Sequence, residues 1–529
     1  MTRHLPSLIL LLALASSAPA APPACTALFP AGGQRGQTVE VAATGSFERW
    51  PAQVWCDRKD VEVSASKEKG KFTVKIAADA VPGVRWLRFY DDQGATAQRP
   101  FIVGVLPEVA EKEPNDDFKK PHTLPGTAVT VNGRLEKAGD VDCFAVTLKQ
   151  GQTLVASLEA NQTLGSPMDG IVQVLSADGF VLQENNDYRG LDPQLVFAAP
   201  RDGAYVVRVF AFPAMPDSSV RFAGGEGYIY RLTLTTGAFA DHAWPAAVAK
   251  ADAAEVELVG WNIPDAAKKR SIEREVGIAF HPEAAGVATV RREPHAVVIA
   301  AETNDRQHPQ TISLPVTVSG RLLQRDAVQA FQFDATKGQK LSFQAEARAL
   351  GFPTEPALRL LDASGKVVAQ AESTAAREAE LAFTAPQDGT YRLEVRDLHA
   401  SGSPRHAYLL RAVRAVPEFD LTLTTDRFVV NPGKPLDIPL TITRRHGFER
   451  AIELSVEGLP PGVTATTVQA GAAANAKTVT LQLKAEAMPA NVPIRIQGKT
   501  AGQDEPTTAR AASDGRTTAH IWLTVAPKP

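Results

Sequence analysis

An internal repeat constrains this chain more than any other feature of its sequence. Residues 131–135 (VNGRL) return as residues 318–322 (VSGRL), and residues 197–205 (FAAPRDGAY) return as residues 383–391 (FTAPQDGTY). The separation stays at about 187 residues, so the motifs keep one register. Motifs that recur at a fixed separation indicate a duplicated structural unit.

Short strands are predicted throughout the chain. Apolar and polar residues alternate in runs such as 72–76 (FTVKI), 205–209 (YVVRV) and 391–395 (YRLEV), and Asp-Gly turns separate such runs at 202–203 and 388–389. Regularly spaced short strands are typical of β-sandwiches. We therefore expect an all-β chain of tandem β-sandwich domains.

The N-terminus is typical of a secretory signal peptide. Arg3 precedes an apolar run at 8–14, and residues 18–20 (APA) supply a small-x-small cleavage pattern. A buried first strand is the alternative. The run is too short to cross a bilayer, and no later segment has the ~20 apolar residues that a transmembrane helix needs. We expect the chain to be secreted, periplasmic or on the cell surface.

The three cysteines leave alternatives open. In an oxidising compartment, Cys25 and Cys56 could form a disulfide that contributes about 3–4 kcal/mol. Cys25 could instead carry a lipid, although Pro22 stands where a lipid-attachment site has an aliphatic residue. Cys143 lies within an alternating run and is expected to be a buried thiol.

The sequence argues against nucleic-acid binding and catalysis. The formal net charge is −3, and no basic patch marks a nucleic-acid surface. Neither a Gly-x-Ser-x-Gly nor a His-Glu-x-x-His motif occurs, and the ten histidines are scattered singly. We therefore expect a protein that is not an enzyme.

The first repeat resembles a known family through residues 111–116 (EKEPND), 139–144 (GDVDCF) and 203–205 (GAY). These motifs are similar to those of the bacterial pre-peptidase C-terminal (PPC) domain family, which includes collagen-binding domains of secreted clostridial collagenases. The resemblance covers roughly 107–236 and 298–414. It implies a compact jelly-roll-like sandwich that accompanies secreted enzymes without being one.

The repeats and the Ig-like modules expected to flank them give a domain plan, whose order also resembles planctomycete-type secreted proteins. The expected segments are a signal peptide (1–20), an Ig-like β-sandwich (21–106), a first PPC-like repeat (107–236), a small Ig-like module (237–297), a second PPC-like repeat (298–414) and a C-terminal Ig-like β-sandwich (415–529). Two features depart from the family: Cys143 stands where an aromatic residue is common, and no peptidase domain accompanies the repeats.

An acidic segment at the start of the first repeat suggests a cation site. Residues two apart in an extended segment project to the same side, so Glu111, Glu113 and Asn115 can share one edge, with Asp116 following. A solvated acidic linker is the alternative for such a composition.

The family resemblance favours the cation site. It implies that Asp140 and Asp142 lie beside the acidic segment, which would gather five carboxylates. Two like charges ~4 Å apart repel by about 4 kcal/mol at an effective dielectric of 20. Ca²⁺ takes six to eight oxygen ligands in flexible geometry, so we expect calcium in the first repeat.

The second repeat provides an internal contrast. Ala300 takes the place of the first glutamate, and Ala327 and Gln329 take the places of the two aspartates, although residues 302–305 (ETND) keep the rest. We expect the second repeat to bind calcium weakly or not at all. A separate acidic loop contains Asp187 and Asp192, which could hold a cation or form Asx turns.

The expected function is that of a multidomain binding or adhesion protein. Its modules would present surfaces to an extracellular protein or polysaccharide, with calcium rigidifying the junction before the first repeat. One alternative is an accessory companion of a secreted peptidase or envelope complex. A cryptic hydrolase that uses Asp140 is a further alternative.

Overall fold

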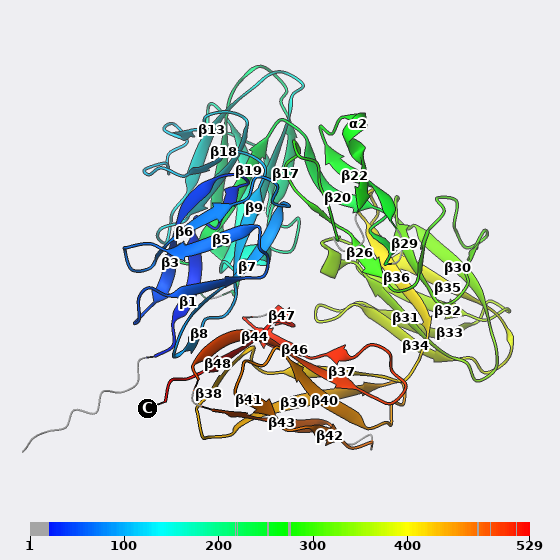
Figure 1. The fold of residues 1–529 in the computed structure, drawn as a ribbon. Coiled ribbons are helices and arrows are strands. Elements are labelled where there is room, and N and C mark those ends of the chain that lie inside the picture. The colour runs from blue at the N-terminus through cyan, green and yellow to red at the C-terminus, as the bar shows by residue number, and fades with distance from the viewer. Residues whose placement is uncertain are drawn as a thin grey trace, which may run out of the picture.

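The structure is a computed structural model that describes residues 21–528 except 217, 219–220, 251–252, 273–276, 473–475, 487 and 515. The proposed signal peptide at 1–20 lies outside the described residues. Almost all regular structure consists of strands, arranged as successive β-sandwiches (Figure 1), which confirms the expected fold class. None of the helices in the described part of the chain is long and apolar enough to cross a membrane.

The first sandwich pairs a sheet of order β1-β3-β6-β5 with a sheet of order β2-β9-β7-β4, and β8 lies beside β7. Alternation builds its core: in β6, Phe72, Val74 and Ile76 are buried while the residues between them are not. The strands are β1 (Ala24–Phe29), β2 (Gly32–Gln34), β3 (Thr38–Ser46), β4 (Gln53–Cys56), β5 (Val61–Ala65), β6 (Lys71–Ile76), β7 (Gly83–Asp91), β8 (Gly94–Ala95) and β9 (Arg99–Gly104).

The possible disulfide between Cys25 and Cys56 is absent from the structure, in which both residues are free thiols. Cys25 lies on β1 beside β9, whereas Cys56 lies on β4 beside β5, so the two residues belong to opposite edges of the sandwich. Burial raises the pKa of each thiol to about 12. Cys143 is buried, as expected, and burial raises its pKa to about 12 as well.

The first repeat is a sandwich of two five-stranded sheets, β10-β12-β19-β14-β17 and β11-β13-β18-β15-β16. Its core contains Phe144, Leu154, Val174, Val207 and Leu232, all fully buried. The elements are β10 (Glu108–Ala110), β11 (His122–Thr123), β12 (Ala128–Arg134), β13 (Asp142–Leu148), β14 (Thr153–Glu159), α1 (Asn161–Leu164), β15 (Met168–Ser176), β16 (Val181–Asn185), β17 (Gln194–Ala198), β18 (Gly203–Pro213) and β19 (Ile229–Thr235).

A smaller module connects the repeats through a three-stranded sheet, β20-β22-β23, and two short strand pairs, β21-β26 and β24-β25. Its elements are β20 (Phe239–Trp244), β21 (Ala247–Ala249), β22 (Ala254–Trp261), α2 (Asp265–Lys268), β23 (Lys269–Ile272), β24 (Ile278–Ala279), β25 (Ala288–Thr289) and β26 (Arg291–Glu293).

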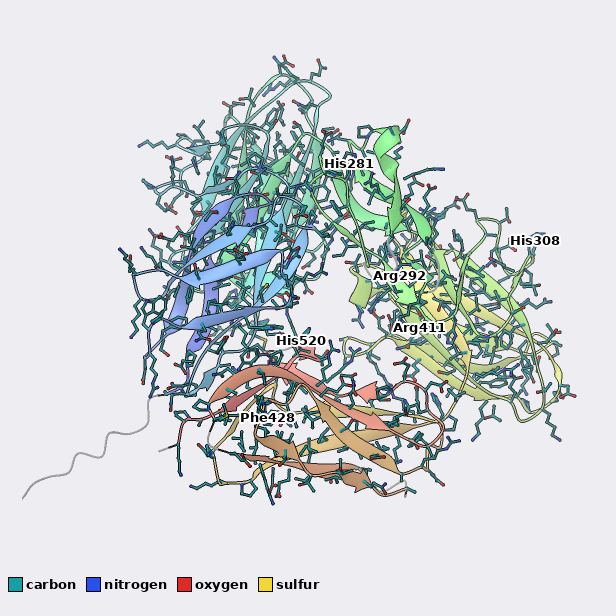
Figure 2. The ribbon with its side chains drawn as sticks, viewed as in Figure 1. His281, Arg292, His308, Arg411, Phe428 and His520 are labelled. Carbon is teal, nitrogen blue, oxygen red and sulfur yellow. The ribbon has the colours of Figure 1, made fainter. Side chains whose placement is uncertain are left out.

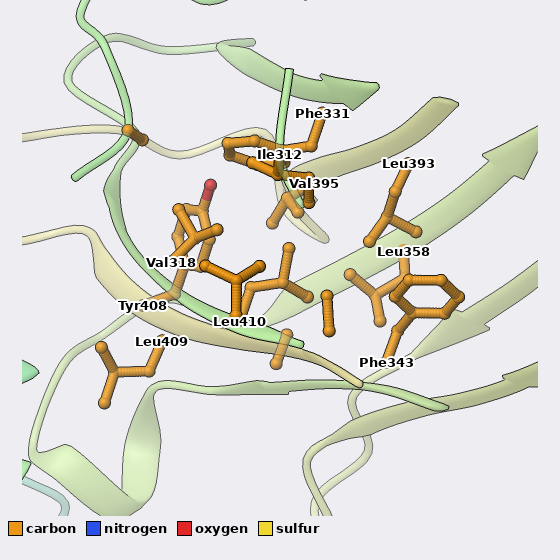
Figure 3. Packing of buried hydrophobic residues seen from close by; sticks show 14 of the residues in the cluster. Ile312, Val318, Phe331, Phe343, Leu358, Leu393, Val395, Tyr408, Leu409 and Leu410 are labelled. Atoms are coloured by element: carbon orange, nitrogen blue, oxygen red, sulfur yellow. The ribbon is translucent and has the colours of Figure 1, made fainter. Parts of the chain in front are cut away.

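The second repeat reproduces the first strand for strand, with sheets β27-β29-β36-β31-β34 and β28-β30-β35-β32-β33. Figure 3 shows its core, in which Phe343, Leu358, Leu393 and Tyr408 pack between the sheets. The elements are β27 (Ala296–Ile299), β28 (Gln310–Thr311), β29 (Val316–Arg321), β30 (Val328–Ala335), β31 (Lys340–Glu346), η1 (Arg348–Leu350), β32 (Pro356–Leu361), β33 (Val367–Glu372), β34 (Ala379–Thr384), β35 (Gly389–Asp397) and β36 (Ala407–Arg414).

The C-terminal sandwich has sheets of order β41-β43-β39-β37-β46-β47 and β38-β48-β44-β40-β42, with β45 beside β44. Its strands are β37 (Glu418–Leu423), β38 (Arg427–Val430), β39 (Leu436–Arg445), β40 (Ile452–Glu457), β41 (Val463–Ala465), β42 (Val468–Ala470), β43 (Thr478–Ala485), β44 (Ala490–Lys499), β45 (Thr507–Thr508), β46 (Arg510–Ser513), β47 (Arg516–Thr518) and β48 (Ile521–Val525).

The C-terminal sandwich returns to the first sandwich, so the two ends of the chain pack together (Figure 1). Nη2 of Arg88 lies 2.6 Å from Oδ2 of Asp426, and both side chains are buried. The Tyr90 and Trp522 rings pack beside this pair with their centroids 4.8 Å apart. A buried ion pair between residues 338 positions apart therefore holds the two sandwiches together.

Candidate metal centre

The acidic segment runs along the edge of the first repeat, directly after β10. Strand β10 pairs in parallel with β12, which places Glu111 beside the end of β12. The backbone N–H of Cys143 donates to the carbonyl of Asn115 at 3.1 Å, so the segment also lies against the start of β13. The peptide bond between Glu113 and Pro114 is cis. These contacts bring the segment to Asp140 and Asp142.

Five of the six predicted ligands form two groups that share one residue. Glu111, Glu113 and Asp142 place one carboxylate oxygen each within 4.8 Å of one another. Glu113, Asp116 and Asp140 do the same. Glu113 belongs to both groups, so the five carboxylates form one continuous cluster around it.

The sixth predicted ligand, Asn115, is buried beside this cluster with 1% of its surface exposed. Within the described residues, neither Oδ1 nor Nδ2 of its side chain has a hydrogen-bond partner. The backbone N–H of Asn115 donates to Oε2 of Glu113 at 3.0 Å. A buried amide oxygen without a donor suits a cation ligand, because leaving it unsatisfied costs about 1–3 kcal/mol.

Tyr230 on β19 closes the buried end of the cluster. Its hydroxyl lies 2.5 Å from Oδ2 of Asp142 and 3.1 Å from Oε2 of Glu111. One hydroxyl proton cannot satisfy two carboxylates at once. Oδ1 of Asp142 is buried and has no hydrogen-bond partner among the described residues. The tyrosine ring packs on Gly133, where a Cβ atom would lie 2.1 Å from Cζ of Tyr230.

Burial and mutual repulsion raise the pKa values of the clustered acids. Burial raises the pKa of Asp142 to about 10, with the Glu111 charge as the next cause. Burial also raises the pKa of Glu111 to about 7, and it raises the pKa values of Glu113 and Asp140. Without a cation, some of these carboxyl groups stay protonated, because the site cannot stabilise all of their negative charges. The donor set is all oxygen and crowded, which fits Ca²⁺.

Backbone groups and one arginine tie the cluster to its surroundings. The backbone N–H of Arg134 donates to Oε1 of Glu111 at 2.5 Å, and the backbone N–H of Glu136 donates to Oδ2 of Asp140. Cζ of Arg134 lies 4.7 Å from the centre of the Phe29 ring, which belongs to the first sandwich. The cluster therefore lies at the junction between the first sandwich and the first repeat.

The second repeat keeps the frame of this site but lacks three of its five acidic residues. The hydroxyl of Tyr408 donates to Oε1 of Gln329 at 2.6 Å, as Tyr230 does to Asp142. The ring of Tyr408 packs on Gly320, where a Cβ atom would lie 2.2 Å from Cζ. An uncharged amide thus satisfies the tyrosine in the second repeat, and Ala300 and Ala327 supply no ligand.

In the second acidic loop, which contains Asp187 and Asp192, Asp192 has a structural role. Both carboxylate oxygens of Asp192 accept backbone N–H groups, at 3.2 Å from Ala160, 2.7 Å from Asn161 and 3.1 Å from Gln162. The Asp192 carboxylate is therefore used to accept the backbone N–H groups at the start of α1. Asp187, the other candidate, is not brought into either carboxylate group.

The labelled histidines do not gather at this site or at another. His281, His308 and His520 lie in three separate parts of the molecule (Figure 2). His520 packs against Trp55 with ring centroids 5.3 Å apart, and its pKa is lowered by burial. Nδ1 of His308 lies 3.1 Å from Oδ1 of Asp305, three residues earlier in the chain. These contacts are packing and turn contacts.

Two features of the site were missed from the sequence. The role of Tyr230 could not be recognised, because a lone tyrosine in an alternating strand gives no sign that its hydroxyl meets a carboxylate. The repeat itself held a signal, since Gly133 and Tyr230 recur as Gly320 and Tyr408. The backbone donors at Arg134 and Glu136 could not be recognised, because any residue type supplies them.

Comparisons with known proteins identify one domain. Residues 140–211 match the family model of the bacterial pre-peptidase C-terminal domain. The chain is 31% identical over 98 residues to a probable subtilase-type serine protease of Deinococcus radiodurans, which covers 18% of this chain and 14% of the relative. The chain thus spans only a small part of that protease. A pre-peptidase C-terminal domain is present in the first repeat.

Two solved structures give weaker similarities. The pre-peptidase C-terminal domain of a Bacillus anthracis collagenase is 14% identical, with a TM-score of 0.16, and the match covers 23% of this chain and 98% of that one. The four N-terminal Ig domains of Dscam1 are 10% identical, with a TM-score of 0.18 and coverage of 93% and 96%.

Proposed function

We propose that this protein is a secreted or periplasmic binding or adhesion protein without catalytic activity, stabilised by calcium in its first repeat. The observation that carries the proposal is the cluster of five carboxylates with the unpartnered, buried Asn115 side chain. Such a cluster is costly when empty and favourable around Ca²⁺. The partner we expect is an extracellular protein or polysaccharide.

The domain plan belongs to the same proposal. The second repeat shares the strand order of the first, which supports a second pre-peptidase C-terminal domain that has lost three of the six proposed ligands. The sandwiches on either side are proposed to be Ig-like modules. The first repeat would use calcium to fix its angle to the first sandwich, because Glu111 is bonded to Arg134 and Arg134 stacks on Phe29.

A second candidate function is an accessory companion of a secreted peptidase. The similarity to part of a subtilase-type protease favours it, because a segment related to this chain is there part of a peptidase. Capture of a specific peptidase from the periplasm or culture medium would support this candidate over a matrix or polysaccharide partner.

The test of the calcium proposal is a thermal melt of the full chain in EDTA and in millimolar Ca²⁺. At a free calcium one hundred times the dissociation constant, binding adds about 2.7 kcal/mol to the stability of the bound unit. The matched variant is Glu113→Ala/Asp140→Ala, which removes the shared ligand and one buried ligand. A calcium-dependent rise in the wild type that the variant lacks supports the proposal; equal melts with and without calcium reject it.

A further inference from the structure

A cavity of about 340 Å³ lies in the second repeat where the first repeat has its carboxylate cluster. Its walls include Trp244 from the preceding module, Leu323 and the polar residues Asn304, Arg321 and Gln329. The volume is within the range of small-molecule pockets. The three carboxylates of the first repeat that are lost here leave a space with a different chemistry.

Arg321 ends β29 and presents its guanidinium to this cavity. Its Cζ lies 3.9 Å from the centre of the Trp244 ring, so the planar group stacks on the indole. The nearest acid is Glu302, whose Oε1 is 4.0 Å away and whose side chain is 75% exposed. In the part of the chain that the structure describes, nothing accepts a hydrogen bond from this guanidinium. The position therefore offers a fixed charge with free N–H groups.

Two amides add further donors on the same wall. Oδ1 of Asn304 accepts the backbone N–H of Ala330 at 2.8 Å, which fixes the amide and directs Nδ2 away from that bond. Asn304 is 6% exposed, and its Nδ2 finds no acceptor among the described residues. Oε1 of Gln329 accepts the hydroxyl of Tyr408, which leaves Nε2 as its donor.

The two repeats thus have opposite polarity at equivalent places. The first repeat gathers acceptors that need a cation. The second repeat keeps the stacked arginine, because Arg321 on Trp244 corresponds to Arg134 on Phe29. It replaces three of the acids with two alanines and an amide, and it keeps Glu302 at the rim of the cavity. The cavity therefore has more N–H donors than acceptors, and an anionic ligand would supply the missing acceptors.

We propose that this cavity binds a carboxylate carried on an apolar group. The guanidinium of Arg321 and the amides of Asn304 and Gln329 would donate to the carboxylate oxygens, while Trp244 and Leu323 cover the apolar part. A carboxylate fits better than a phosphate, because one arginine supplies the positive charge and Glu302 at the rim repels a dianion. The proposal does not depend on calcium in the first repeat.

The test is a calorimetric titration of the full chain with N-acetyl-L-leucine, and with N-acetyl-L-leucinamide as the matched probe without a carboxylate. We expect the acid to bind with a dissociation constant below about 1 mM and the amide to bind at least 10-fold more weakly. A leucine-terminated peptide, with its C-terminus free or amidated, tells a peptide end from a small free acid. No binding of either acid up to 20-fold above that concentration overturns the proposal.

Three variants locate the binding. Arg321→Gln should weaken binding of the acid at least 10-fold, while Arg359→Gln, on β32 of the same repeat, should leave it unchanged. Glu302→Gln should tighten binding severalfold, because it removes a competing carboxylate from the rim. A misfolded variant cannot gain affinity, so this increase separates a site from a fold defect. Unchanged affinity in both Arg321→Gln and Glu302→Gln overturns the proposal.

Discussion

Replacing Asp142 with asparagine should stabilise the protein in EDTA and abolish its response to calcium. Asp142 is fully buried, its Oδ1 has no partner among the described residues, and Glu111 crowds it from the side. Asparagine keeps an acceptor for the hydroxyl of Tyr230 and has no proton to lose in the unfolded chain. The second repeat already uses this solution, because Gln329 accepts the hydroxyl of Tyr408.

The size of the gain follows from the pKa of Asp142. Burial raises this pKa from 3.8 to about 10, so the folded protein keeps the carboxyl protonated at pH 7 while the unfolded chain ionises it. Each pH unit between the ordinary pKa and the solution pH costs about 1.4 kcal/mol of folding free energy, which gives about 4 kcal/mol at pH 7. Because the surrounding protein relaxes around a buried charge and reduces this cost, we expect Asp142→Asn to raise the free energy of unfolding by about 2–4 kcal/mol.

The assay is a thermal melt in EDTA at pH 7 and at pH 4.5. For a unit the size of one repeat, a gain of about 2–4 kcal/mol raises the midpoint by about 6–15 °C. A buried acid whose pKa is raised by folding destabilises the folded protein once the pH exceeds the acid's ordinary pKa. The stability gained from Asp142→Asn should therefore shrink toward zero at pH 4.5.

The second repeat supplies the reverse control. Gln329→Asp should lower the midpoint at pH 7 by a similar amount, because it buries a carboxyl beside Tyr408. The reasoning is wrong if Asp142→Asn lowers the midpoint in EDTA, or if this variant keeps the full calcium response of the wild type.

Other consequences concern the same site and the closure of the chain. Calcium should bind more tightly at pH 8 than at pH 5.5, because Glu111, with a pKa of about 7, must lose its proton; equal affinities in calorimetric titrations would contradict this. Gly133→Ala should weaken calcium binding at least 10-fold, because its Cβ would displace the ring of Tyr230, and unchanged binding would argue against that ring's role. Arg88→Ala should lower the free energy of unfolding by about 3–5 kcal/mol in chemical denaturation, because it leaves Asp426 buried and unpaired. It should also raise the radius of gyration in X-ray scattering; an unchanged radius would show that other contacts hold the two terminal sandwiches together.

The sequence predicted the fold class because strand alternation is local. In β6, the side chains of Phe72, Val74 and Ile76 reach the core from every second position, and this pattern needs no knowledge of distant residues. The register of the repeat further indicated that two segments share one architecture, and they do share a strand order. The acidic segment was found for the same local reason, since Glu111, Glu113 and Asn115 lie two residues apart.

What the sequence could not predict depends on contacts between distant residues. Tyr230 meets Asp142 across 88 positions, and Arg88 meets Asp426 across 338. Nothing local distinguishes such residues from other polar positions in strands. The sequence left the pairing of Cys25 open for the same reason, because sharing a sandwich does not bring two strands to the same edge. The sequence left Asp192 between a cation ligand and an Asx turn, because its backbone donors lie about thirty positions earlier in the chain.

The most direct test of the account is the calcium stoichiometry of the full chain, measured by calorimetric titration. The carboxylate cluster of the first repeat predicts binding that disappears in Glu113→Ala/Asp140→Ala. The alanines and glutamine of the second repeat predict that this variant retains no site of comparable affinity. Calcium binding that survives the double substitution, or that is absent from the wild type, would contradict the assignment of the cluster as a calcium site.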